Sequence, residues 1–324
     1  LGPFLHGDGA AVGQGGGDGA GDPGHGLLVD RSLDEHAGAR HAGLAAAFEN
    51  AAGHRLVAVI AWQQLSPASR ETISAALAGH PDHGRWVERA RSDDGVDILA
   101  EASTWPDDIR SDPRFHDEDR ESPTPPLPGL PDTARHKRWH YVDFDAAGRV
   151  SDGELDRQID RLAKMLRSAP KKAQNADALP WLLHLVADIH QPLHVGLDGD
   201  EGGNKVEIEN PFNKRLPFTN VHTYWDDLPG PPWLRGKRLE KNTARLLETY
   251  PAPPQGDVRL WRDESHRLLA GAYPTANGSL LPVVDEEFHR RARDIADRRI
   301  VEAGYRLGRL LESIFGPRVS RETP

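Results

Sequence analysis

Two pairs of residues in this chain of 324 residues have the side-chain types and the spacing to bind one metal ion each. His184 and Asp188 lie four positions apart in the segment WLLHLVADIHQPLH, and His222 and Asp226 repeat this spacing in VHTYWDD. On a helix, side chains at i and i+4 project from the same face. For a single pair, a buried hydrogen bond between histidine and aspartate is the common alternative. Two such pairs in one chain favour zinc, which binds neutral imidazole and carboxylate.

Other segments contribute further histidine and aspartate side chains, although none is decisive alone. Asp107 follows a proline in WPDDIR and therefore lies at a helix start or bend, with Arg110 one turn later. An acidic cap with an i, i+3 ion pair is the simpler interpretation of that segment. His140 lies between aromatic residues in WHYVD, where a half-buried strand is the alternative. His54 belongs to a Gly-His pair in the first predicted helix, and His194 follows a turn that lets it face a second ion.

The amino-acid composition excludes several classes of site. The chain has no cysteine, which excludes disulfides, thiolate nucleophiles and cysteine-based zinc sites. A transition metal would have to bind the 16 histidines and the 50 acidic residues. The net charge of −10 excludes a general electrostatic attraction to nucleic acid, so phosphate binding would need local cations such as metal ions. No run of 18 apolar residues is present, and no transmembrane helix is predicted.

Long amphipathic segments with few strands predict an all-α fold, a single compact domain of many helices over residues 49–318 with a small hairpin or loop insertion. Residues 111–135 are rich in proline and acids and predict a long surface loop, whereas residues 196–221 predict the glycine-rich loop with the hairpin. The apolar periodicity predicts helices over residues 50–65, 69–77, 85–110 (in two pieces), 152–168, 174–190, 237–249, 257–271 and 284–314.

Residues 1–48 differ in composition from the rest of the chain. They hold 13 of the 32 glycines and almost no periodic apolar pattern, so they predict a disordered tail or a mis-assigned leader. No basic start followed by an apolar stretch is present there, and hence no recognisable signal peptide. Residues 319–324 predict a short C-terminal tail.

The motifs, taken in chain order, resemble those of one known family. They are Gly-His at residue 54, W-x-D-x-x-R at 105–110, H-Y-x-D at 140–143, H-x-x-x-D-x-x-x-P-L-H at 184–194, G-G-N at 202–204 and H-x-x-x-D at 222–226. This set resembles the S1/P1 nuclease family of zinc-dependent nucleases, over about four-fifths of the chain. The resemblance implies a nearly all-helical fold, similar to that of the zinc phospholipases C, with three zinc ions in a cleft.

The resemblance also implies the activity, the substrates and the location. The expected enzyme is an endonuclease that hydrolyses single-stranded DNA and RNA to 5′-mononucleotides and acts as a 3′-nucleotidase, removing 3′-phosphates from nucleotides. It implies a secreted or periplasmic protein, and no protein partner is implied.

Carried over by position, the resemblance implies a role for each motif residue. The ligands of the first, deeper zinc would be Asp107, His140, His184 and Asp188. Asp188 would bridge to a second zinc that His54 also binds. The ligands of the third, more exposed zinc would be His194, His222 and Asp226. Arg110 would contact the phosphate, and Tyr141 and Asp143 would stack on a nucleobase and hydrogen-bond to it. The expected catalytic residues are Asp107, Arg110 and Asp188, whereas His136 and His190 match no ligand position.

The chemistry of phosphodiester hydrolysis fits such a set. A bridged zinc pair about 3.5–4 Å apart activates water at neutral pH. A third cation can stabilise the leaving 3′-oxygen, and Arg110 can bind a non-bridging oxygen in a bidentate manner. Three divalent ions would also make the cleft of an acidic protein locally positive.

One position departs from the family pattern. The family begins with a tryptophan five residues before the Gly-His histidine, and its α-amine and carbonyl complete the second zinc site. Here Glu49 stands at that position and the chain continues upstream. Either the chain is cleaved nearby, or the Glu49 carboxylate serves as the ligand. Two alternatives to a nuclease stay open: a phospholipase C-like zinc phosphodiesterase, and a zinc-binding homologue whose altered N-terminus impairs catalysis.

Overall fold

Helices account for most of the computed structural model, which describes residues 51–130, 132–168, 176–276 and 278–317. The prediction of an all-α fold is confirmed. The α-helices of the described residues are α2 (Ala51–Gln63), α3 (Pro67–Ala78), α4 (His83–Ala90), α5 (Gly95–Ala102), α6 (Trp105–Asp108), α7 (Leu155–Ser168), α8 (Ala178–Asp188), α9 (Val221–Asp227), α10 (Gly236–Thr249), α11 (Val258–Leu268) and α12 (Glu286–Phe315). Short 3-10 helices are η2 (Ile109–Ser111), η3 (Lys137–Trp139), η5 (Pro192–Val195) and η6 (Leu269–Gly271).

Two antiparallel hairpins interrupt the helices in the described part of the chain. Strands β3 (Glu207–Glu209) and β4 (Phe218–Asn220) form the predicted hairpin. Strands β1 (Val142–Phe144) and β2 (Val150–Gly153) form a second hairpin, of which the sequence analysis offered only a half-buried strand at WHYVD. The helix predicted from residue 152 therefore begins later, at α7, because the preceding residues pair with β1.

The helix boundaries follow local chemistry. Ser66 caps α3 by accepting a hydrogen bond from the backbone of Ser69, with Pro67 as the first helical residue. The two helical pieces predicted over residues 85–110 are instead three helices. Pro106 lacks a backbone N–H and is favoured in the first turn of a helix, and it lies in the first turn of a separate helix, α6, which begins at Trp105 and carries Asp107.

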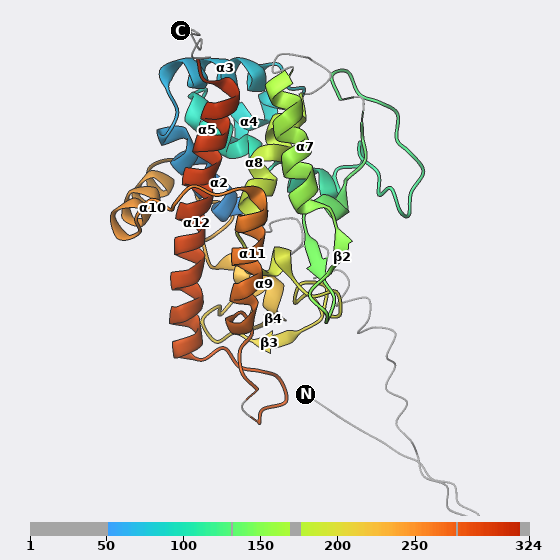
Figure 1. The fold of residues 1–324 in the computed structure, drawn as a ribbon, viewed down its shortest axis with the longest axis vertical. Helices are drawn as coiled ribbons and strands as arrows, with labels where there is room; N and C mark the ends of the chain where they lie inside the picture. Colours follow the sequence, from blue (N-terminus) through green and yellow to red (C-terminus); the bar gives the residue numbers. More distant parts are fainter. Residues whose placement is uncertain (1–50, 131, 169–175, 277, 318–324) are drawn as a thin grey trace, which may run out of the picture. The chain divides into compact units, whose positions relative to one another are not determined.

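Two clusters of buried apolar side chains form the interior. The larger one packs α2, α5, α7 and α8 against the C-terminal half of α12, with Leu56, Leu183 and Leu307 fully buried. The smaller one packs β3 and α9 against the N-terminal half of α12. In Figure 1, α12 (red) runs along α2 (blue), and α7 lies beside α8. The long helix α12 thus belongs to both clusters.

Residues 111–130 and 132–135 form the predicted loop and contain no α-helix. Arg114 anchors its start through Asp82 and Asp112, with nitrogen–oxygen distances of 2.8–3.1 Å. Over the residues that the structure covers, no helix is both long and apolar enough to span a membrane.

Candidate metal centre

Three predicted ligands, His140 directly after η3 and His184 and Asp188 on α8, meet in the interior. His140 Nδ1 lies 3.0 Å from His184 Nε2, and Asp188 Oδ2 lies 3.2 Å from each of these nitrogens. A tetrahedral zinc ion with bonds of about 2.0–2.1 Å holds neighbouring ligand atoms about 3.3 Å apart. The three atoms therefore fit around one ion.

Asp188 directs its two oxygens at different groups of ligands. Its Oδ2 faces His140 and His184, while its Oδ1 lies 3.4 Å from His54 Nε2 and 3.9 Å from His194 Nε2. Asp188 is fully buried, and among the described residues its Oδ1 has no hydrogen-bond partner. A buried carboxylate oxygen needs a partner, and a cation between Oδ1 and the nearby imidazoles would supply it.

Asp107 reaches two candidate ions. Its Oδ1 lies 3.6 Å from His184 Nε2, and its Oδ2 lies 3.8 Å from His54 Nε2. His54, Asp107 and His184 form a second group with converging ligand atoms. The sequence analysis assigned Asp107 to the first ion alone, so the structure adds a carboxylate to the surroundings of His54.

The third group lies nearer to solvent. His194, His222 and Asp226 place their ligand atoms within 4.8 Å of one another. His222 Nε2 is 3.5 Å from Asp226 Oδ2, as expected for the i, i+4 pair on α9. His194 comes from η5, which follows α8 directly and brings its ring 4.9 Å from that of His222.

Backbone carbonyls orient three of the imidazoles. The Nδ1 atoms of His184, His194 and His222 lie 2.9, 2.6 and 2.8 Å from the carbonyl oxygens of Ser103, His140 and Gly202. Each Nδ1–H donates to its carbonyl, so that Nε2 is the ring nitrogen that faces the ligand group and can bind a metal once it is deprotonated. Such hydrogen bonds fix the tautomer that metal binding requires.

Gly202 belongs to the Gly-Gly-Asn motif and positions one of these carbonyls. Its φ of +60° lies in the left-handed region, and a Cβ there would stand 2.4 Å from the Leu193 carbonyl oxygen. Only glycine fits this turn, which explains the motif's place in the site.

Burial and charge hold most of these groups in the form that binds a metal. Burial lowers the pKa of His140 to about 3 and that of His194 to about 4, so both are neutral. Burial opposes a charge on His184 too, but Asp188 and Asp107 outweigh it and raise its pKa to about 9. Metal uptake must then displace a proton from His184.

A cleft of about 490 Å³ opens beside His140, His194 and His222 and contains the predicted substrate-binding residues. Arg110 lines it, with its guanidinium 3.6 Å from Asp107 Oδ1. The Tyr141 hydroxyl donates to Asp152 at 2.9 Å.

Asp143 lines the same cleft and is only 6% exposed. Burial and the neighbouring carboxylates of Asp152, Asp200 and Asp198 raise its pKa to about 6. Near neutral pH it can therefore exist as acid or carboxylate.

The remaining sequence candidates lie outside the ligand groups. His136 stacks on Trp139 with ring centroids 3.7 Å apart. His190 is buried, donates from Nδ1 to the Val186 carbonyl at 2.8 Å, and accepts from Arg306 at 2.9 Å. Glu49 lies outside the described residues.

Two supporting side chains had no recognisable sequence pattern. Gln191 donates to Asp226 Oδ1 at 3.0 Å and so orients a ligand of the third group. Glu101 is buried and binds Arg55 at 2.9 Å and Arg235 at 2.6 Å. Since Arg55 follows His54 on α2, this ion cluster fixes that helix against α5.

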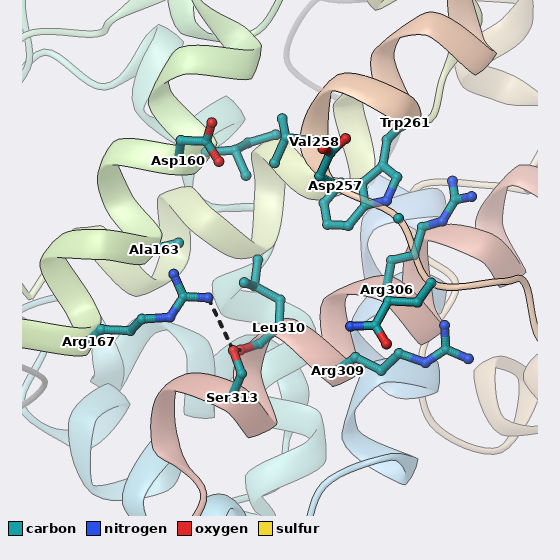
Figure 2. Close-up of a pocket in the computed structure, with 13 residues that line it drawn as sticks. Asp160, Ala163, Arg167, Asp257, Val258, Trp261, Arg306, Arg309, Leu310 and Ser313 are labelled. Carbon is teal, nitrogen blue, oxygen red and sulfur yellow. Dashed lines mark hydrogen bonds between the residues drawn. The ribbon is translucent and has the colours of Figure 1, made fainter.

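A second cavity, of about 260 Å³, lies between α7, α11 and α12 (Figure 2). Its lining includes Asp160, Trp261 and Leu310, with Arg167 donating to Ser313 at 3.2 Å. None of the predicted site residues lines it. Of the predicted ligands, His140, His194 and His222 line the other cleft, together with Arg110.

A buried carboxylate between groups of imidazoles, on a helical scaffold beside an arginine-lined cleft, is typical of multinuclear metal-dependent hydrolases. Comparison with known proteins identifies the family. The S1/P1 Nuclease profile matches residues 50–316, and the chain belongs to this family.

Three relatives illustrate the similarity. Endonuclease 3 of Arabidopsis thaliana is 32% identical over 242 residues, which are 67% of this chain and 76% of that protein. Nuclease S1 of Aspergillus oryzae is 24% identical over 295 residues, covering 81% of this chain and 90% of the relative. Endonuclease 4 of Arabidopsis thaliana is 31% identical over 157 residues, 43% of this chain, and the match spans half of that protein.

Proposed function

We propose that this chain is a zinc-dependent endonuclease that cleaves single-stranded DNA and RNA to 5′-mononucleotides and also acts as a 3′-nucleotidase. Family membership supports a nuclease that acts on nucleic acid. The observation that carries the proposal is Asp188, whose two oxygens face different groups of imidazoles. Two of the three groups share His184, whose free Nε2 can bind only one ion, so the second ion of the proposal depends on His54, Asp107 and Asp188. The ligands are the nitrogen and oxygen atoms that zinc prefers.

In this proposal, zinc supplies Lewis acidity to the phosphate, activation of the attacking water, and stabilisation of the leaving 3′-oxygen. The chain's own residues bind and orient the substrate. Arg110 binds a non-bridging phosphate oxygen, because its planar guanidinium can form two parallel hydrogen bonds. Tyr141 stacks on the base, and Asp143 hydrogen-bonds to the base edge. Gln191 keeps Asp226 in place.

Metal analysis combined with activity measurements tests the proposal. The purified full chain is expected to contain about two firmly bound zinc ions and to bind the third, beside His54, weakly, and to hydrolyse single-stranded DNA, RNA and 3′-nucleotides slowly. Chelation with EDTA should abolish hydrolysis and zinc should restore it. Bound zinc without turnover of any nucleic acid would indicate the homologue with impaired catalysis. Turnover of phosphatidylcholine without turnover of nucleic acid would indicate the phospholipase C-like alternative.

The second ion needs a separate experiment. Within the described residues it has His54, Asp107 and Asp188 nearby, with distances of 3.4 and 3.8 Å from His54 Nε2 to the carboxylates. We propose that an α-amine at position 49 would complete this site, because its pKa of about 7.7–8.0 allows deprotonation on a metal at neutral pH. A variant beginning at residue 49 should therefore bind more zinc and react faster than the full chain. Equal zinc content and equal rates, with the full chain confirmed intact by mass spectrometry, would assign the role to a side chain.

Export of the protein to the periplasm or medium is a further part of the proposal, supported by the family resemblance alone. Fractionation of the source cells, with immunodetection of the chain, tests it.

A further inference from the structure

The charges that line the cleft are unevenly distributed along the chain. The cleft lining that comes from residues 110–138 includes one acid, Asp119, and four cations: Arg110, Arg120, Lys137 and Arg138. These four lining cations are here called the basic segment, although residues 110–138 as a whole hold six acids and six lysines or arginines. The lining residues from 140 onward include no lysine or arginine and contribute four acids: Asp143, Asp152, Asp198 and Glu201. A polyanion in this cleft would therefore be attracted to the basic segment and repelled elsewhere.

The four cations differ in their partners. Arg110 faces Asp107, Lys137 forms an ion pair with Asp117, and Arg138 forms one with Asp152. Arg120 is exposed, and its side chain makes no hydrogen bond or close ion pair with any residue that the structure describes, although, after the hydrogen bond from Lys137, its charge helps to lower the pKa of Asp117. Its guanidinium can therefore bind a phosphate without breaking an existing pair.

The backbone around Arg120 forms a defined turn. The backbone N–H groups of Arg120 and Glu121 donate to the Asp117 carbonyl at 3.1 and 2.8 Å. The Glu121 carboxylate accepts from the Asp117 N–H at 2.8 Å and lies 3.3 Å from Arg135. Asp117 is also paired with Lys137 of η3. This turn is thus tied to the segment that leads directly to His140.

We propose that single-stranded polynucleotides extend from the metal centre along the basic segment, and that Arg120 binds a phosphate beyond the scissile one. The inference rests on the proposed function. It adds the path of the strand, and it names Arg120 as a residue that favours polynucleotides over mononucleotides as substrates. A 3′-mononucleotide has a single phosphate, and in this proposal the metal centre and Arg110 bind it. Only a longer substrate offers a second phosphate to Arg120, and arginine binds phosphate in a bidentate geometry.

The test compares a polymer with a mononucleotide of the same base. The ratio kcat/KM is measured for an oligothymidylate of about 12 nucleotides and for thymidine 3′-monophosphate. Arg120→Ala should lower the value for the oligonucleotide roughly 5- to 10-fold, and change that for the mononucleotide less than about twofold. For the oligonucleotide, the negative slope of log kcat/KM against log salt concentration should be less steep in Arg120→Ala than in the wild type, by about 0.7.

Arg238→Ala is the matched control, since Arg238 is exposed on α10, outside the cleft, and its loss removes the same charge. This control should leave both substrates and the salt slope unchanged. Equal effects of Arg120→Ala and Arg238→Ala would overturn the proposal.

A wild-type chain that hydrolyses neither substrate would contradict the proposed function instead. Binding of the labelled oligothymidylate, measured by fluorescence anisotropy, then tests the basic segment without depending on hydrolysis. Weaker binding by Arg120→Ala than by Arg238→Ala supports the path, and equal binding overturns it.

Discussion

The inner and the outer candidate ligands of the proposed metal centre depend on different parts of the molecule. The inner set (His54, Asp107, His140, His184 and Asp188) comes from α2, α6, α8 and the segment after η3, packed on the larger apolar cluster. The outer set (His194, His222 and Asp226) comes from η5 and α9, whose Leu193 and Trp225 belong to the smaller cluster. The inner set is assembled by tertiary packing and shares Asp188, whereas the outer set is built mainly by one helix. We therefore expect one substitution in the inner set to remove both inner ions, and a substitution in the outer set to remove the outer ion alone.

The largest effect is expected for Asp188→Asn. The amide offers one oxygen in place of a bridging carboxylate, so both inner ions should lose a ligand and a negative charge. Both inner sites should lose their metal, which leaves about one zinc ion per chain at the outer set, and hydrolysis of single-stranded DNA should become undetectable. Metal analysis and a nuclease assay, with circular dichroism to verify folding, check this. Near-normal zinc content and rate would mean that Asp188 bridges no ions.

His222→Ala should separate the outer set from the inner one. The inner ions should stay bound, while kcat falls roughly 10²–10³-fold because charge stabilisation at the leaving oxygen is lost. Zinc content and kcat are measured together, with His83→Ala on α4 as the histidine control outside the ligand groups. A variant that loses thermal stability but keeps kcat would show that the outer site is structural.

The difference between the two sets also explains what the sequence could predict. The i, i+4 pairs on α8 and α9 were predictable, because helical geometry alone brings His184 to Asp188 and His222 to Asp226. The all-α fold was predictable from apolar periodicity. These features depend on neighbours in the chain.

Features that depend on distant neighbours were not predictable. The carbonyl of Ser103 that orients His184 comes from a residue 81 positions away, and no side-chain pattern marks a backbone oxygen. Gln191 and Glu101 have polar side chains that fit surface positions equally well. The hairpin of β1 and β2 was missed because the strands are only three and four residues long, and Gly153 at the end of β2 adopts a φ of +80°.

A smaller effect is expected for substitution of Tyr141, which belongs to neither ligand set. Stacking on a base contributes about 1–3 kcal/mol, so Tyr141→Ala should raise KM for single-stranded DNA roughly 5- to 150-fold. Hydrolysis of a small phosphodiester without a base should change little. Tyr141→Phe is the matched control, since it keeps the ring and loses only the hydrogen bond to Asp152. Equal losses on both substrates would argue against a base pocket and favour the phospholipase C-like alternative.

The smallest effect concerns the stability of the metal-free protein and involves Asp143. Its pKa rises from 3.8 to about 6 in the fold, through burial and the adjacent carboxylates. Between these values the folded chain keeps a proton that the unfolded chain has lost. The stabilisation is therefore complete below about pH 4 and disappears as the pH rises through 6. Two pKa units correspond to about 3 kcal/mol at most.

Asp143→Asn imitates the protonated acid at every pH, so its free energy of unfolding should exceed that of the wild type above pH 6 and approach it near pH 4. Urea unfolding in EDTA across this range measures the difference, with the exposed Asp93→Asn as control.

The same unfolding measurement with added zinc in place of EDTA distinguishes the outer ligand set from the inner one. Because charge on His222 already lowers the pKa of Asp143, an ion bound by the outer set should lower it further and reduce the pH dependence. The reduction should vanish in His222→Ala, in which only the inner ions remain, whereas its persistence there would assign the effect to the inner set.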